Sequence, residues 1–238
     1  METSPIGKVF ATPTGFPEEV IATAQELGVA TIAAGMADPW PRFHLFEQSL
    51  HRISGTGAIA GRAVTCWNPP GNNTMVRFAI EACAPGDVLV LTTPTDGTAQ
   101  WGDLAHDWAA AVGLAGVIID GSVRDVEGIR RVGLSLWART VDPRQSLKQA
   151  LGYVNAPIHT AGVSIDPGDL IVADDDGVLV VPHSEASEVV AKAKERADRE
   201  ELSRKDLVQG RVSPHLAAIF DADAIKLVGT TWTGGAVT

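Results

Sequence analysis

Residues 102–125 hold the stretch that most constrains the fold, because a short helix, a buried strand and a charged turn follow one another there. The helix is predicted to begin at Gly102 and to stop at Gly113, since glycine is common just past a helix end. The apolar run at 116–119 predicts a buried strand. The turn after it carries three charged residues, Asp120, Arg124 and Asp125. Charged side chains at the ends of regular elements can face a cleft while the backbone stays rigid.

Helices and buried strands alternate in the first part of the chain, and hairpins follow. Residues 17–27 predict a helix with Pro17 in its first turn and a stop at Gly28. The continuous apolar run at 87–93 is typical of a strand covered on both faces. The pair Asp176-Gly177 between two apolar runs predicts a hairpin. This order favours a mixed α/β layered domain over a simple doubly wound sheet.

The other periodic segments predict a regular core with a long helix near the end of the sequence. Strands are expected at 63–67 and 134–139, and helices at 74–83, 126–132 and 184–208. Asn72 or Asn73 is available to cap the second helix. The segment before residue 60 is expected to be an irregular, partly helical cover. The last helix is nearly all charged beyond Ala197, so this end is either solvated or packed against a neighbouring subunit.

The candidate site residues each have an alternative structural interpretation. Asp103 could act only as a first-turn acid at a helix start, Asp125 as a helix N-cap and Arg124 as a surface ion pair. His106 and Asp107 are predicted to lie on a solvated face. The core face of that helix is expected to consist of Leu104, Trp108, Ala111 and Val112. The conjunction of carboxylates and an arginine around one buried strand is what favours an acid-handling site.

Charge and composition exclude several classes of protein. The formal net charge is −10 and the sequence pI is about 5.0, which argues against a nucleic-acid surface. The sequence has no signal-peptide pattern and no run of eighteen apolar residues, so we expect no membrane association and a cytoplasmic location. The two cysteines, Cys66 and Cys83, are expected to be buried free thiols.

Six segments in a fixed order together resemble one known family. They are GDVLVLTT, WGDL, GVIIDGSVRD, SLWART, VNAPIHTAGVSIDPGD and LIVADDDGVLVVP. They are similar to the class II 4-hydroxy-4-methyl-2-oxoglutarate and 4-carboxy-4-hydroxy-2-oxoadipate aldolases, whose fold is shared with regulators of ribonuclease activity A. The resemblance covers roughly residues 55–212. It implies an α/β/β/α layered sandwich in homotrimers or hexamers with active sites between subunits. The whole chain, 1–238, is interpreted as one domain with a helical cover at 1–54, a catalytic core at 55–183 and a helix and tail at 184–238.

The resemblance also implies roles for particular residues. Arg124 looks like the substrate-binding arginine and Asp125 like the ligand of a divalent metal, Mg²⁺ or Mn²⁺. The remaining substrate-binding candidates are Gly102, Asp103, Leu104, Ala105 and Asn73. Glu200 or Glu201 looks like a glutamate that reaches the active site of a neighbouring subunit. His106 and Asp107 depart from the expected pattern, and Trp67 and Trp101 are expected to add bulk near the site. These departures leave the far half of the substrate open.

The expected activity is cleavage of a 4-hydroxy-2-oxo acid to pyruvate and a second 2-oxo acid, with oxaloacetate decarboxylation as a side reaction. A metal is favoured over a lysine Schiff base, because only Lys226 of the six lysines has apolar neighbours. The alternative is a non-catalytic regulator that binds a ribonuclease. A methyltransferase is disfavoured, since the glycines Gly55, Gly57 and Gly61 precede a strand and not a helix.

Overall fold

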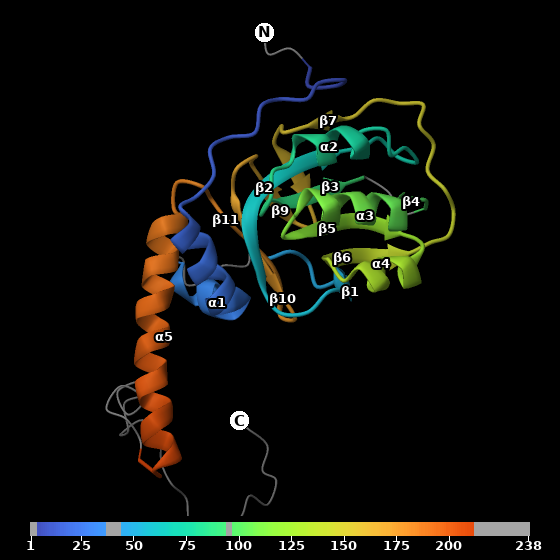
Figure 1. The fold of residues 1–238 in the computed structure, drawn as a ribbon. Coiled ribbons are helices and arrows are strands. Elements are labelled where there is room, and N and C mark those ends of the chain that lie inside the picture. The colour runs from blue at the N-terminus through green and yellow to red at the C-terminus, as the bar shows by residue number, and fades with distance from the viewer. Residues whose placement is uncertain (1–3, 37–43, 94–96, 212–238) are drawn as a thin grey trace, which may run out of the picture. The chain divides into compact units, whose positions relative to one another are not determined.

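The protein is described by a computed structural model over residues 4–36, 44–93 and 97–211, and Figure 1 shows the order of its elements. The helices are α1 (Glu18–Gly35), α2 (Val76–Ala82), α3 (Asp103–Val112), α4 (Val126–Val132) and α5 (Ala186–Val208). The strands are β1 (His51–Ser54), β2 (Ile59–Trp67), β3 (Val88–Thr92), β4 (Ala99–Trp101), β5 (Gly116–Val123), β6 (Ser135–Val141), β7 (Tyr153–Val154), β8 (Ile158–Thr160), β9 (Val163–Ile165), β10 (Leu170–Asp174) and β11 (Gly177–Val181).

A mixed sheet forms the centre of the fold. Its main path runs β1-β6-β5-β3-β2-β10-β11, with β4 paired to β5 and β7 paired to β2, while β8 and β9 form a separate hairpin. The strands β2, β3, β5 and β6 are parallel to one another, whereas β1, β10 and β11 pair antiparallel at the two ends of the path. Strand β3 is buried along its whole length, as expected for a parallel strand covered on both faces.

Three buried apolar clusters separate four layers. The first packs α2, α3 and α4 against one face of β2, β3, β5 and β6, and Figure 1 shows these helices on that face. The second lies between the other face of these strands and the layer made by β8 to β11. The third packs β10 and β11 against α1 and the start of α5. This order of layers confirms the predicted α/β/β/α sandwich and its N-terminal helix.

The prediction for the segment before residue 60 was partly wrong. His51–Ser54 is strand β1, which pairs antiparallel with β6 at the sheet edge. Helix α1 also continues past its predicted stop at Gly28, where the backbone has a positive φ of 73° and kinks. The Asp174 carboxylate accepts a hydrogen bond from the Val29 N–H at 2.8 Å, which satisfies a donor at the restart of the helix. Tertiary contacts therefore decide both features.

Two further local predictions need correction. Strand β5 extends to Val123, so Asp120 lies inside the strand and not in the turn after it. Helix α2 begins at Val76, and neither candidate asparagine caps it. The Asn72 Oδ1 atom instead accepts hydrogen bonds from the N–H groups of Gln149 and Ala150, each at 3.0 Å. The asparagine side chain thus ties down a distant loop.

The chain divides into a unit at 1–195 and a second unit at 196–238. In the second unit the described residues, 196–211, comprise the end of α5 and a turn. The organisation as one domain over 1–238 stays a prediction. None of the helices in the described residues has the length and apolar character needed to cross a bilayer.

Both cysteines are free, as predicted. Burial raises the pKa of the Cys66 thiol well above its usual range, and it raises the pKa of the partly buried Cys83 to about 12. Neither thiol is therefore a thiolate at neutral pH.

Candidate active site

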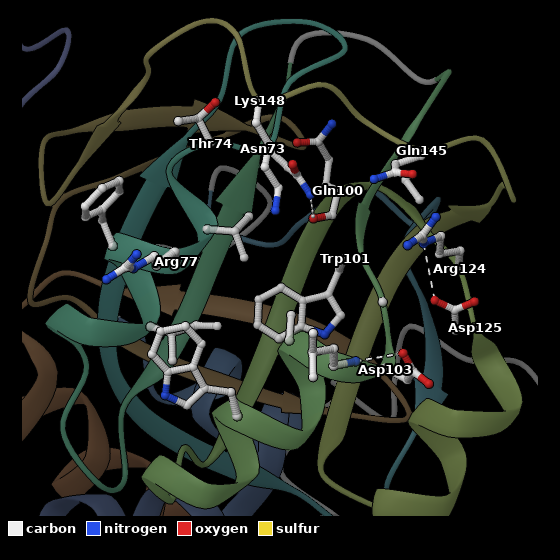
Figure 2. A pocket seen from close by; sticks show the side chains of 18 residues that line it. Asn73, Thr74, Arg77, Gln100, Trp101, Asp103, Arg124, Asp125, Gln145 and Lys148 are labelled. Atoms are coloured by element: carbon white, nitrogen blue, oxygen red, sulfur yellow. Dashed lines mark hydrogen bonds and ion pairs between the residues drawn. The ribbon is translucent and has the colours of Figure 1, made fainter.

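A pocket of about 510 Å³ lies where α2, α3 and the turn before α4 meet (Figure 2). Strand β4 ends at Trp101, directly before α3, and β5 ends at Val123, directly before the Arg124-Asp125 turn. Parallel strands place the residues that follow them at the same edge of a sheet, where α/β proteins commonly bind ligands. The Arg124 N–H donates a hydrogen bond to the Trp101 carbonyl at 3.0 Å and holds the two strand ends together.

Every substrate and metal candidate predicted within a single subunit lines this pocket. These residues are Asn73, Gly102, Asp103, Leu104, Ala105, Arg124 and Asp125. They come from the segment before α2, the start of α3 and the turn after β5, so the fold brings together positions that are distant in the sequence. Their individual roles stay predictions.

Arg124 and Asp125 form an ion pair at the pocket rim, with 3.2 Å between Arg124 Nε and Asp125 Oδ2. Asp125 precedes α4 in the left-handed conformation, at φ 57° and ψ 39°. It occupies the N-cap position, but its side chain makes no capping hydrogen bond. An aspartate held in this conformation with its carboxylate left out of the cap is typical of a binding site. This geometry argues against a purely structural N-cap.

Gly102 is required by the close approach of this ion pair. A Cβ atom at this position would lie 2.7 Å from Asp125 Oδ2 and 3.5 Å from Arg124 Nε. The backbone of Gly102 is extended, with φ −146°, so space and not conformational freedom selects glycine here. The carboxylate can therefore sit against the backbone at the start of α3.

Asp103 is the first residue of α3, and its Oδ1 atom accepts a hydrogen bond from the Leu104 N–H at 2.8 Å. A Cβ atom added to Gly128 in α4 would lie 2.7 Å from Asp103 Cβ, so α3 and α4 meet closely at this aspartate. The first-turn role considered for Asp103 is thus present, and the same side chain also lines the pocket.

The predicted core face of α3 was largely wrong, although Val112 packs against the core as predicted. Leu104 is 81% exposed, Trp108 is partly exposed and Ala111 is exposed, whereas His106 and Ala109 are fully buried. The helix is therefore turned so that Trp108 lines the pocket.

His106 belongs to the core and not to the predicted solvated face, although Asp107 is exposed as expected. The Trp101 indole N–H donates to His106 Nδ1 at 3.3 Å. Burial lowers the pKa of His106, and both the Leu134 carbonyl and the Asp107 charge oppose that shift. Trp67, predicted to lie near the site, instead stacks on Tyr153 with 5.4 Å between ring centroids.

Asp120 is occupied by structural contacts and does not line the pocket. Its carboxylate accepts hydrogen bonds from Arg139 Nε at 2.6 Å, from Thr160 Oγ1 at 2.7 Å and from the Ala161 N–H at 2.8 Å. These contacts tie strand β5 to the β8–β9 hairpin. The predicted grouping of Asp120 with Arg124 and Asp125 was therefore wrong.

Sequence reasoning missed several polar residues of the pocket, namely Thr74, Arg77, Gln100, Gln145 and Lys148. The last two lie between β6 and β7, a segment without periodicity. Hydrogen bonds from this loop to Gly71, Asn72 and Ala99 hold it at the pocket. Asn73 Nδ2 donates to the Gln100 carbonyl at 3.2 Å. Asn73 Oδ1 and Gln100 Oε1 are buried and find no hydrogen-bond partner among the described residues.

Glu200 and Glu201 lie on α5 in the second unit. Glu200 pairs with Arg196 at 2.9 Å, and Glu201 lies 3.6 Å from Arg204. Their predicted role across a subunit interface stays a prediction.

The carboxylates of the pocket fit a hard divalent ion that takes its remaining ligands from water and substrate oxygens. Within the described ranges, no three His, Cys, Asp or Glu side chains converge as a complete metal cage. Mg²⁺ is commonly held by one or two carboxylates, with water and substrate oxygens filling the other positions. Asp125, whose carboxylate makes no cap and reaches the pocket, supplies such a ligand.

Comparison with known proteins identifies the family. A family model described as RraA-like, Aldolase/RraA, matches residues 29–180, so the chain belongs to this family. It is 37% identical over 148 residues to a putative 4-hydroxy-4-methyl-2-oxoglutarate aldolase of Halalkalibacterium halodurans, covering 61% of this chain and 70% of that protein. It is 32% identical over 152 residues to a 4-hydroxy-4-methyl-2-oxoglutarate aldolase of Thermus thermophilus, covering 62% of this chain and 90% of that protein.

Solved structures agree with this assignment. The chain is similar to Streptomyces coelicolor RraAS2, described as an unusual member of the RNase ES inhibitor RraA protein family. The TM-score is 0.70 at 28% identity, and the match covers 80% of this chain and 98% of that one. The family thus includes proteins described as aldolases and one described through ribonuclease inhibition.

Proposed function

We propose that this protein is a divalent-metal-dependent pyruvate aldolase that cleaves 4-hydroxy-2-oxo acids, such as 4-carboxy-4-hydroxy-2-oxoadipate or 4-hydroxy-4-methyl-2-oxoglutarate. The observation that carries the proposal is the convergence of Asp103, Arg124 and Asp125 on one pocket. Two carboxylates and an arginine there match the needs of a 2-oxo acid, which presents anionic oxygens and must lose a hydroxyl proton. The similarity to proteins described as 4-hydroxy-4-methyl-2-oxoglutarate aldolases supports the same class.

The reaction breaks the bond between carbons 3 and 4 of the substrate. Asp103, acting through a water molecule, takes the proton of the 4-hydroxyl group, and carbon 4 becomes a carbonyl. The electron pair of the broken bond remains on carbon 3 as the pyruvate enolate, which Arg124 stabilises with its guanidinium. A divalent ion held by Asp125 would supply Lewis-acid stabilisation of the same negative charge. Protonation of carbon 3 then gives pyruvate.

A lysine Schiff base is a poorer account of this pocket. Lys148 is the lysine in the pocket lining, and it is exposed. A lysine nucleophile needs a desolvated site to become neutral near pH 7. Lys226, the candidate with apolar neighbours in the sequence, lies outside the described residues.

Two further properties belong to the proposal. The same enolate chemistry gives oxaloacetate decarboxylation as a side activity. The active unit is a homotrimer or hexamer in which Glu200 or Glu201 reaches a neighbouring subunit.

The direct test uses protein stripped with EDTA and pyruvate detection by coupled lactate dehydrogenase. We expect Mg²⁺-dependent pyruvate release from 4-carboxy-4-hydroxy-2-oxoadipate, 4-hydroxy-4-methyl-2-oxoglutarate or both, and from oxaloacetate. No pyruvate from any of the three with Mg²⁺ or Mn²⁺ would contradict the proposal.

The second candidate is a non-catalytic regulator that binds a ribonuclease, and the similarity to the Streptomyces protein favours it. A ribonuclease E pull-down by a protein without metal-dependent turnover would support this candidate. An Asp125→Ala variant with unchanged pyruvate release would instead keep the aldolase and reject the role of Asp125.

A further inference from the structure

The pocket has a charged end at Arg124 and Asp125, and the part of its lining that α2 and α3 provide is largely apolar. In Figure 2, Arg124 and Asp125 lie on one side of Trp101, and Arg77 of α2 lies on the other. Six side chains from α2 and α3 provide apolar surface to the lining, Val76, Phe78, Ile80, Leu104, Ala105 and Trp108. A 2-oxo acid held at the charged end would therefore extend its remaining carbons along an apolar wall.

Trp101 forms a fixed part of this wall. The indole is almost fully buried, and its N–H donates to His106 Nδ1 at 3.3 Å. The two rings meet edge to face, with 6.5 Å between centroids and 85° between planes. His106 is itself buried, and burial favours the neutral imidazole that can accept this hydrogen bond. The wall is therefore preformed and does not depend on the ligand.

The other two cations of the lining, Arg77 and Lys148, are poorly suited to recognise a second carboxylate. The Arg77 guanidinium is paired with Glu81, with 3.0 Å between Nε and Oε1, and lies 5.8 Å from the Phe78 ring centroid. Lys148 is exposed. A solvated cation contributes little to the binding of an anion, whereas removal of apolar area from water contributes in proportion to that area.

We propose that the substrate of this site is a 4-hydroxy-2-oxo acid whose substituent on carbon 4 is uncharged and apolar, aliphatic or aromatic. This inference rests on the proposed aldolase function, and it makes the two carboxylated substrates named above poorer substrates than an uncharged analogue. The bond between carbons 3 and 4 breaks, the 4-hydroxyl proton leaves through Asp103, and carbon 3 takes up a proton. The products are pyruvate and an apolar aldehyde or ketone, and no oxidant or reductant is consumed.

The test compares 4-hydroxy-2-oxo-4-phenylbutanoate with 4-carboxy-4-hydroxy-2-oxoadipate in the presence of Mg²⁺. We expect kcat/KM for pyruvate release to be at least about tenfold higher with the phenyl substrate, the discrimination that a small difference in an apolar pocket provides. An equal or higher kcat/KM with the tricarboxylate would overturn the inference.

Variants at Trp108 sharpen the test. Trp108→Ala should lower the ratio of kcat/KM for the phenyl substrate to kcat/KM for the tricarboxylate about tenfold. Trp108→Lys should lower this ratio further, because the added cation favours the tricarboxylate. The matched control is Leu151→Ala, an exposed apolar side chain outside the pocket lining, which should leave the ratio unchanged. A ratio insensitive to both Trp108 variants, in proteins with wild-type thermal melts, would also overturn the inference.

Exchange of the pyruvate methyl protons with D₂O, followed by NMR, separates the two proposals because pyruvate lacks the variable substituent. Metal-dependent exchange together with a tricarboxylate preference would retain the aldolase and reject the apolar substrate. Absence of exchange with Mg²⁺ and Mn²⁺, and of pyruvate release from either substrate, would reject the aldolase itself.

Discussion

Strand β5 connects two arginine–aspartate pairs that differ in how far the protein satisfies them. The Asp120 carboxylate, inside the strand, receives hydrogen bonds from Arg139, Thr160 and the Ala161 backbone. Asp125, just past the strand, has one ion pair with Arg124, a left-handed backbone and no capping bond. A carboxylate saturated by protein donors stabilises the fold, whereas one left open at a pocket is available to a ligand.

The largest expected effect concerns the open pair, Arg124 and Asp125, whose loss should reduce activity strongly and stability little. Arg124→Ala and Asp125→Ala should each reduce kcat/KM for pyruvate release by about 1,000-fold, because charge stabilisation in the transition state is lost. The pair is half-exposed, so the free energy of unfolding should change by less than about 1 kcal/mol. Coupled kinetics and urea titrations measure the two effects. Wild-type activity in either variant would contradict the assignment.

The next largest effect tests whether the open pair needs the space that Gly102 leaves beside it. Gly102→Ala places a methyl group against Asp125 Oδ2, and a displacement of about 1 Å at a reacting group costs roughly 100-fold in rate. Gly15→Ala is the matched control, because a Cβ atom there makes its nearest contact at 3.8 Å. Equal kinetics for the two variants would show that Gly102 is not constrained by the carboxylate.

The saturated pair, Asp120 and Arg139, should respond in the opposite way, with a loss of stability and not of activity. Asp120→Asn leaves Arg139 without its partly buried counter-ion, and we expect a loss of about 3 kcal/mol in the free energy of unfolding. Activity per folded molecule should stay near that of the wild type. Glu188→Gln, which breaks an exposed pair with Lys192, is the control and should change the urea midpoint little. A stable but inactive Asp120→Asn protein would reverse the comparison.

The smallest expected effect concerns His106 beneath the pocket. Its folded pKa is lowered by burial, so the unfolded state binds the proton more readily. This contribution to stability is complete above the unfolded pKa of about 6.5 and is lost as the pH falls from there towards the folded pKa. Thermal melts between pH 8 and pH 5 should show a smaller decline in His106→Gln than in wild type. Identical declines would contradict a buried neutral imidazole.

Much of the fold was predictable because the apolar runs at 87–93 and 116–119 allow few alternatives to buried parallel strands. Asp103, Arg124 and Asp125 were predictable because they stand at the ends of regular elements. The family resemblance, and not the local pattern, pointed to Asn73 and to the rest of the run 102–105. The other features depended on contacts between residues that are distant in the sequence. A local pattern of apolar and polar residues does not reveal such contacts. The orientation of α3 depended on the bond between Trp101 and His106, and the extent of β5 depended on its pairing with β6. Lys148 reaches the pocket through hydrogen bonds between its loop and residues distant in the sequence, among them Asn72 and Gly71.

The most direct test of the central claim follows the exchange of pyruvate methyl protons with D₂O in wild-type and Arg124→Ala proteins, with and without Mg²⁺. The predicted result is Mg²⁺-dependent exchange in the wild type and loss of that exchange in the variant. Exchange that is absent from the wild type, or that persists unchanged in Arg124→Ala, would contradict an enolate-forming site at Arg124 and Asp125.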